Sequence, residues 1–140
     1  MKRLLATTSF ALIYQVTFAI TVYLILGAGE FFGANNRYPE MNNPENMTPL
    51  INYFGSCIVG IGYYLGFKKF KDEESSLISG AKFGLFVSIF AEITHRIFLE
   101  GFNDMFVNNY IAALESLIWV SHHIILGVAT AFIFQKIKDN

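Results

Sequence analysis

The stretch GAKFGLFVSIFAEITHRIF, residues 80–98, is apolar and long enough to cross a bilayer, yet it contains ionisable side chains. Every fourth residue of this stretch lies on one ridge of an α-helix. These residues are Gly80, Gly84, Ser88, Glu92 and Arg96. Small residues allow a neighbouring helix to approach closely, and ionisable residues in a bilayer normally face the interior of a helix bundle. We therefore expect this helix to be central, with the other helices packed on its small and polar face.

The composition of the chain indicates a membrane protein. Its 140 residues are 54% hydrophobic and 15% charged, whereas soluble domains have about 25% charged residues. The length fits one domain. The formal net charge of −1 provides no broad basic field, so we expect no nucleic-acid partner.

Four apolar segments predict an all-α fold, an integral membrane four-helix bundle. The predicted spans are residues 4–27, 50–67, 78–98 and 110–132, and the polar residues 30–47 are predicted to form an outer loop. The basic start at Lys2 and Arg3 is also found in signal peptides, but residues 4–27 exceed the ~7–15 residues of a signal-peptide apolar region. We therefore expect a retained transmembrane helix. Pro49 is typical of a helix start, and Ser75 or Ser76 can cap the third helix.

Glycines predict where the helices pack. The second span contains Gly60 four residues after Ser56, and Gly66 four residues after Gly62. Both pairs have the small-xxx-small spacing that brings membrane helices together. We expect the helix contacts to involve Gly60, Gly62, Gly66, Gly80, Gly84 and Ser88.

Lysine and arginine predict the orientation of the chain in the membrane. With four spans and both termini on one side, eight basic residues fall on that side, against Arg37 and Arg96 on the other. The eight are Lys2, Arg3, Lys68, Lys69, Lys71, Lys82, Lys136 and Lys138. Basic residues accumulate on the cytoplasmic side of membrane proteins. We therefore expect a multi-pass protein with both termini in the cytoplasm (N-in, C-in).

A cluster of ionisable residues is predicted in the outer half of the membrane. With a rise of ~1.5 Å per residue, Glu92, His95 and Arg96 lie roughly 6–12 Å from the centre of their span. Glu115 of the fourth span lies at a similar depth. His122 is two helical turns further along the same face of that span. We expect these five side chains to form one buried cluster.

Buried carboxylates and imidazoles have coupled proton equilibria and can relay protons or contact ions. The leading hypothesis is a small, non-enzymatic membrane protein whose cluster handles protons, ions or a small polar solute. The chain lacks a Gly-rich phosphate loop, a cysteine pair, and the HExxH and GxSxG motifs. A single copy of this length encloses little, so a pathway is expected in a homo-oligomer or with other membrane subunits.

Two other functions fit the same residues. In a structural or assembly subunit, the cluster would act as a helix lock, in which paired charges fix how the helices pack. In a redox subunit, histidines would hold haem b or contact a quinone, with His95, His122 and His123 as candidate haem ligands. A mononuclear metal site has Glu92, His95 and Glu115 as candidate ligands. No cofactor is expected under the leading hypothesis.

The predicted orientation can be tested with thiol labelling. A cysteine introduced at Asn43 should react with an impermeant thiol reagent added outside the cell. A cysteine introduced at Asp139 should react only when the reagent is given access to the cytoplasmic side, because the lysine-rich ends of the spans are retained in the cytoplasm. Labelling of position 43 only from the cytoplasmic side would reverse the topology.

Overall fold

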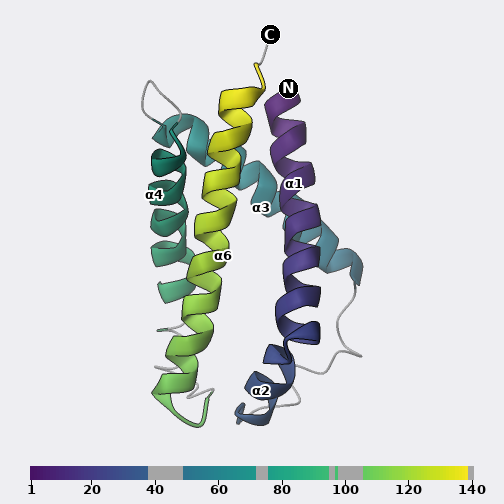
Figure 1. The fold of residues 1–140 in the computed structure, drawn as a ribbon, viewed down its shortest axis with the longest axis vertical. Coiled ribbons are helices and arrows are strands. Elements are labelled where there is room, and N and C mark those ends of the chain that lie inside the picture. The colour runs from purple at the N-terminus through teal and green to yellow at the C-terminus, as the bar shows by residue number, and fades with distance from the viewer. Residues whose placement is uncertain (38–48, 72–75, 95–96, 98–105, 139–140) are drawn as a thin grey trace.

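The computed structural model describes residues 1–37, 49–71, 76–94, 97 and 106–138, and the side chains of all of these except 49–52, 92 and 93. This part of the chain is all-helical and contains no strand, which confirms the predicted class. In order, the elements are α1 (Lys2–Phe18), η1 (Ala19–Ile25), α2 (Ala28–Ala34), α3 (Pro49–Phe70), α4 (Leu77–Ser88), η4 (Ile89–Ile93) and α6 (Asn109–Lys136), where η denotes a π-helical segment (Figure 1).

Two helices are long and apolar enough to cross a membrane. They are the 24-residue helix Lys2–Ile25, which joins α1 and η1, and the 28-residue α6. Both cover predicted spans, and a span needs only about 20 apolar residues. α3, with 22 residues, covers the predicted span 50–67. The helix that begins with α4 is apolar over Leu77–Ala91. Its predicted end at residue 98 lies outside the described residues.

Side-chain caps determine where two helices begin. The Oγ of Ser76, one of the two serines predicted to cap this helix, accepts a hydrogen bond from the backbone N–H of Ser79 at 3.0 Å at the start of α4. The Oδ1 of Asn108 accepts one from the N–H of Ile111 at 3.0 Å. Each cap satisfies a backbone donor that the first helical turn would otherwise leave without a partner.

The first span does not end in the predicted loop. Gly27 adopts a left-handed conformation with φ of 73°, which glycine accommodates without a Cβ clash. A second helix, α2, follows at once, so the loop prediction for residues 30–47 is wrong at residues 30–34. The reason is tertiary packing, because Phe32 is buried against Phe106. The rest of the predicted loop, from residue 38, lies outside the described residues.

α4 and α6 approach each other until their backbones touch. A Cβ atom on Gly84 would overlap with the carbonyl oxygen of His123. A Cβ atom on Gly80 would lie 2.5 Å from the carbonyl oxygen of Gly127. Ser88, the next residue on the ridge, is fully buried. Real Cβ atoms essentially never come this close to another heavy atom. Only glycine therefore permits this contact.

α1 and α3 form a second close pair. A Cβ on Gly60 would lie 2.7 Å from the Cα of Thr8. Gly66 faces the ring of Phe83 on α4, where a Cβ would lie 2.7 Å from the ring. Gly62, by contrast, has no atom within 4 Å of such a Cβ and is exposed, so it takes no part in packing within this chain.

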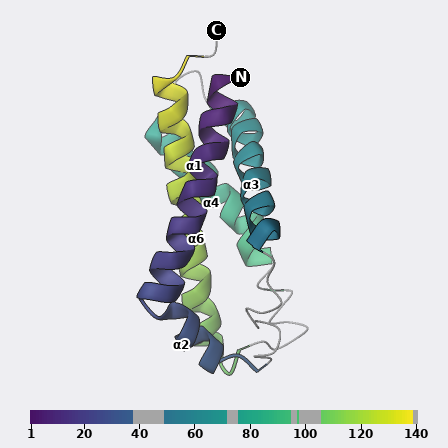
Figure 2. The same ribbon diagram turned by 90° about the vertical axis from the view of Figure 1, so that its right-hand side faces the viewer.

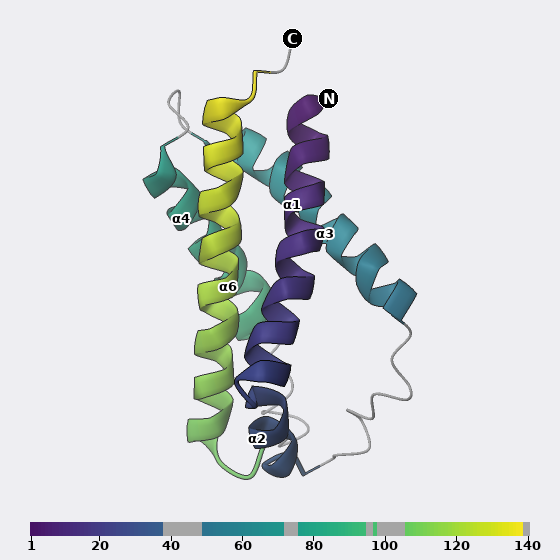
Figure 3. The same cartoon turned by 45° about the vertical axis from the view of Figure 1, so that its right-hand side comes forward.

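The helix at the centre of the fold is α6, not the helix predicted from residues 80–98. α6 contacts α4 most extensively and also meets α1 and α3, whereas α4 packs mainly on α6. α3 runs obliquely across the other long helices (Figure 1, Figure 3). Among the described residues, the prediction of a central third helix was wrong because α1 and α3 contact α6 more extensively than they contact α4.

Both chain ends lie at the same end of the molecule, and α2 lies at the other (Figure 1, Figure 2). Arg3 ties the two ends together. Its Nε donates to the carbonyl oxygen of Ile137 at 2.5 Å and its Nη2 donates to that of Phe134 at 2.9 Å. The guanidinium carbon also lies 4.9 Å from the centre of the Phe134 ring. Arg3 thus caps the carbonyl end of α6, where a positive charge is favourable.

The backbone contact predicts a difference between two glycines. Gly84→Ala should lower the free energy of unfolding by about 1–3 kcal/mol, since the added methyl group forces α4 and α6 apart. Gly62→Ala is the matched control, because its methyl group enters open space and alanine favours helix by about 1 kcal/mol over glycine. Thermal unfolding in detergent measures both. Equal tolerance of the two substitutions would contradict the contact.

Candidate functional site

The structure describes only part of the predicted ionisable cluster. Glu92 lies on η4, but its side chain is outside the described residues, as are His95 and Arg96 entirely. Glu115 is half-buried on α6, and His122 is buried two turns further along the same helix. A shared cluster of all five therefore stays a prediction. The described part of the site is centred on His122 and its neighbour His123.

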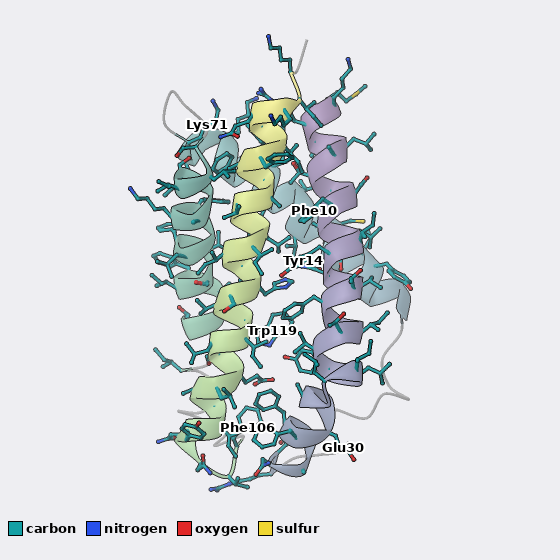
Figure 4. All side chains as sticks on the ribbon, in the orientation of Figure 1. Phe10, Tyr14, Glu30, Lys71, Phe106 and Trp119 are labelled. Atoms are coloured by element: carbon teal, nitrogen blue, oxygen red, sulfur yellow. The ribbon has the colours of Figure 1, made fainter. Side chains whose placement is uncertain are left out.

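His122 is buried against aromatic rings between α1 and α6, with only 1% of its surface exposed. Its ring stacks on Tyr14 with centroids 4.9 Å apart and an interplanar angle of 18°. Phe18 lies at 4.5 Å, and Trp119 contacts the imidazole edge-on at 5.3 Å. Tyr14 points from α1 toward α6, and Trp119 points from α6 toward α1 (Figure 4). Three aromatic side chains thus surround one buried imidazole.

His123 is buried on a different side of α6, where it meets α3. Its Nδ1 lies 2.7 Å from the hydroxyl oxygen of Tyr63. The same hydroxyl donates to the backbone carbonyl oxygen of His123 at 3.1 Å. The two rings are nearly parallel, with an interplanar angle of 4° and centroids 6.0 Å apart. Because Gly84 of α4 packs on that carbonyl group, His123 stands at the junction of three helices.

The helix geometry explains why two adjacent histidines meet different partners. Neighbouring residues of an α-helix project about 100° apart. His122 therefore faces α1 while His123 faces α3. The centroids of the two imidazole rings are 5.5 Å apart, so the two groups remain in contact with each other.

Apolar layers lie on both sides of the histidine pair along α6. Toward the chain ends, the pair is followed by a buried cluster that includes Phe67, Phe83, Leu126 and Phe134. Toward α2, the buried cluster consists of Phe32, Phe106, Ile111 and Ala112. The two buried imidazoles thus lie between two apolar clusters, where a buried polar group that lacks a hydrogen bond costs several kcal/mol.

Tyr14, Tyr63 and Trp119 were not predicted to be site residues, and His123 was predicted only as a candidate haem ligand. A signal for Tyr63 was present, because it lies three residues after Gly60 and so shares its packed helix face. Extending the glycine pattern along the helix would have placed Tyr63 in the interior.

The chemistry of the described site is that of imidazole and phenol. Histidine changes charge near neutral pH, and Tyr63 supplies a hydroxyl that both donates and accepts hydrogen bonds. Among the residues that the structure describes, no group of three or more histidine, cysteine, aspartate or glutamate side chains could hold a metal ion. Two of the three predicted metal ligands, Glu92 and His95, fall outside that search.

Comparisons with protein-family models, curated proteins and solved structures found no match to this chain. No relative therefore informs the role of these residues.

The hydrogen bond between α3 and α6 predicts a stability difference between two tyrosines of α3. Tyr63→Phe should lower the free energy of unfolding by about 1–3 kcal/mol, because it removes the hydroxyl partner of a buried imidazole and carbonyl group. Tyr53→Phe makes the same chemical change at a side chain that is 48% exposed, and should cost less than about 0.5 kcal/mol. Chemical unfolding in detergent compares the two. A loss of similar size in both variants would rule out a special role for Tyr63.

Proposed function

We propose that this chain is a small multi-pass membrane protein that handles protons, ions or a small polar solute through its buried polar centre. The observation that carries the proposal is the burial of His122 and His123 midway along α6, a helix long and apolar enough to span a bilayer. Ionisable residues at such a depth are costly and normally serve a pathway or a relay. The predicted cluster of Glu92, His95, Arg96 and Glu115 would extend this centre toward the α2 end.

The exterior of the helices supports a membrane location. Large apolar side chains are exposed on each of the long helices, among them Leu24 (76%), Phe54 (70%), Ile78 (69%) and Leu117 (63%). In water, a continuous surface of this kind promotes aggregation, whereas in a bilayer it contacts lipid chains. This agreement between helix length and apolar exterior favours lipid as the surrounding medium.

The distribution of charge supports four spans with both termini in the cytoplasm. The two termini lie at one end of the molecule, together with Lys71, and Glu30 lies at the opposite end (Figure 4). Exposed lysines of α1, α3 and α6 lie close to the end that holds the termini. They are Lys2, Lys68, Lys69 and Lys136. Positive charge at one end of a bundle is typical of the cytoplasmic side.

The geometry favours protons among the three species. The contact between the two imidazole rings and the hydrogen bond of His123 to Tyr63 provide groups that exchange protons without a large cavity. Apolar clusters lie on either side of the described centre within one copy. A pathway to both sides would therefore require helix movement, a second copy of the chain or another membrane subunit.

One observation favours the structural alternative, in which the same groups act as a helix lock. Tyr63 contacts both the ring and the carbonyl group of His123, and the backbone of Gly84 packs on that carbonyl group. These contacts hold α3, α4 and α6 together whether or not a proton moves. The redox alternative is less well supported, because Tyr14, Phe18 and Trp119 already contact the His122 ring, and a haem would have to displace them.

Proton flux and stability measured on the same variants test the proposal. Wild-type protein in proteoliposomes with an internal pH-sensitive dye should dissipate a pH gradient. His122→Phe and His123→Phe should lose this activity, because neither ring retains a titratable nitrogen. Ser121→Ala is the matched control, since the Ser121 side chain is exposed and bonds only to Leu117 of its own helix among the contacts described.

The outcomes separate the candidate functions. Flux lost in both histidine variants, with folding retained, supports proton handling. Absence of flux in the wild-type protein, together with lower stability of His123→Phe, would favour the helix lock. A stoichiometric Soret band in the purified protein that disappears in His122→Ala would favour the redox alternative.

A further inference from the structure

We propose that the end of the bundle that holds both chain termini is a binding surface for the headgroups of anionic phospholipids. The lipid phosphates contact four exposed lysines, which are Lys2 on α1, Lys68 and Lys69 on α3, and Lys136 on α6. The inference rests on the membrane location proposed above, but not on the handling of protons.

Charge is distributed unevenly over the predicted four-span bundle, although the formal net charge is only −1. The side predicted to be cytoplasmic has eight basic residues and four acidic ones, at positions 72–74 and 139, which is an excess of four positive charges. The rest of the chain has two basic residues and seven acidic ones, an excess of five negative charges. An anionic leaflet attracts the first side and repels the second.

The part of the chain that the structure describes has the same asymmetry. Its acidic side chains are Glu30 and Glu115, and both lie away from the termini. Glu30 lies at the opposite end of the molecule (Figure 4), and Glu115 lies in the second turn of α6, the helix that ends beside the termini. Residues 72–74 and 139 lie outside the described residues. Because four acidic residues cannot neutralise eight basic ones, part of the counter-charge comes from outside the chain.

Each of three helices places a lysine about one turn beyond an exposed apolar side chain. Residues three or four positions apart share a helix face. On α6, the Nζ of Lys136 lies 5.8 Å from the centre of the Phe132 ring, so the lysine side chain extends along an apolar surface. The pairs are Lys2 with Leu5 on α1, Lys68 with Leu65 on α3, and Lys136 with Phe132 on α6.

This arrangement sets the depth of the lysines relative to the lipid. In a bilayer, the exposed apolar side chains contact lipid chains, and the lysine stems follow the apolar surface while the ammonium groups reach the polar layer. The ammonium groups of three helices therefore lie at the level of the lipid phosphates. Each lysine near an anionic surface strengthens binding by about five-fold.

Arg3 brings two of the three helix ends together. It donates to the carbonyl groups of Phe134 and Ile137 and so holds the end of α1 against that of α6. Lys2 is the neighbour of Arg3 in sequence, and Lys136 is the neighbour of Ile137. Like charges on adjoining helix ends repel each other, and a phosphate group that contacts both removes the repulsion. Lys2 and Lys136 are thus the centre of the proposed surface.

Native mass spectrometry of the full chain in detergent tests the surface. The added lipids are phosphatidylglycerol, which is anionic, and phosphatidylcholine with the same acyl chains, which is not. The wild-type protein should bind phosphatidylglycerol at least about ten-fold more tightly. The preference should decrease as the concentration of ammonium acetate is raised, because salt screens exposed charges.

Variants of the lysines test which residues form the surface. Changing all four lysines to glutamine should reduce the preference to less than about two-fold, whereas changing all four to arginine should preserve it. Arg37→Gln is the control for loss of a basic residue, since Arg37 is exposed just after α2, at the opposite end, and the preference should be unchanged. If the glutamine variant does not fold, Lys2→Gln combined with Lys136→Gln removes the central pair and should also reduce the preference.

The outcomes separate this surface from other ligands and from the proposed function. Equal binding of the two lipids by the wild-type protein, or an unchanged preference in the glutamine variants, would overturn the proposal. Displacement of phosphatidylglycerol by millimolar inorganic phosphate would identify a free anion as the ligand and would overturn it as well. The lipid preference is measured without a pH gradient. Absence of proton flux would therefore leave the surface intact, and flux without a lipid preference would remove only the surface.

Discussion

The close contact of the α4 and α6 backbones is the constraint on which the rest of the structure depends. Gly84 and Gly127 allow carbonyl groups to stand where side chains would normally keep the helices apart. In a bilayer, lipid chains are as apolar as leucine, so helix association depends on packing and polar contacts. The same contact fixes the His123 carbonyl group. The packing of two helices therefore also sets the position of an acceptor for Tyr63.

The sequence was a good guide to features that depend on local spacing. The all-helical class, a serine cap at residue 75 or 76 and the burial of Gly80, Gly84 and Ser88 follow from residue types at fixed intervals. It was a poor guide to features created by distant parts of the chain. α2 packs through the contact of Phe32 with Phe106. Similarly, α6 is central because α1, α3 and α4 all pack on it, which the pattern within residues 80–98 does not reveal.

The candidate site was only partly predictable for the same reason. His122 was selected because it lies on one helix face with Glu115, which is a local pattern. The bond from Tyr63 to His123 joins residues 60 positions apart, and no spacing rule reveals it. A pattern of charged residues also does not include tyrosine. Its phenol is neutral but has both a hydrogen-bond donor and an acceptor. Aromatic residues on packed faces of membrane helices are therefore candidates for polar sites as well as for packing.

The two histidines lie in different surroundings, although they are neighbours on one helix. Around His122 are the rings of Tyr14, Phe18 and Trp119, all from α1 and α6. His123 instead makes a hydrogen bond to the hydroxyl of Tyr63 on α3. Because adjacent residues of a helix project about 100° apart, one turn of α6 places one imidazole among aromatic rings and the next beside a hydroxyl. The position of each ring is therefore set by contacts with a different neighbouring helix.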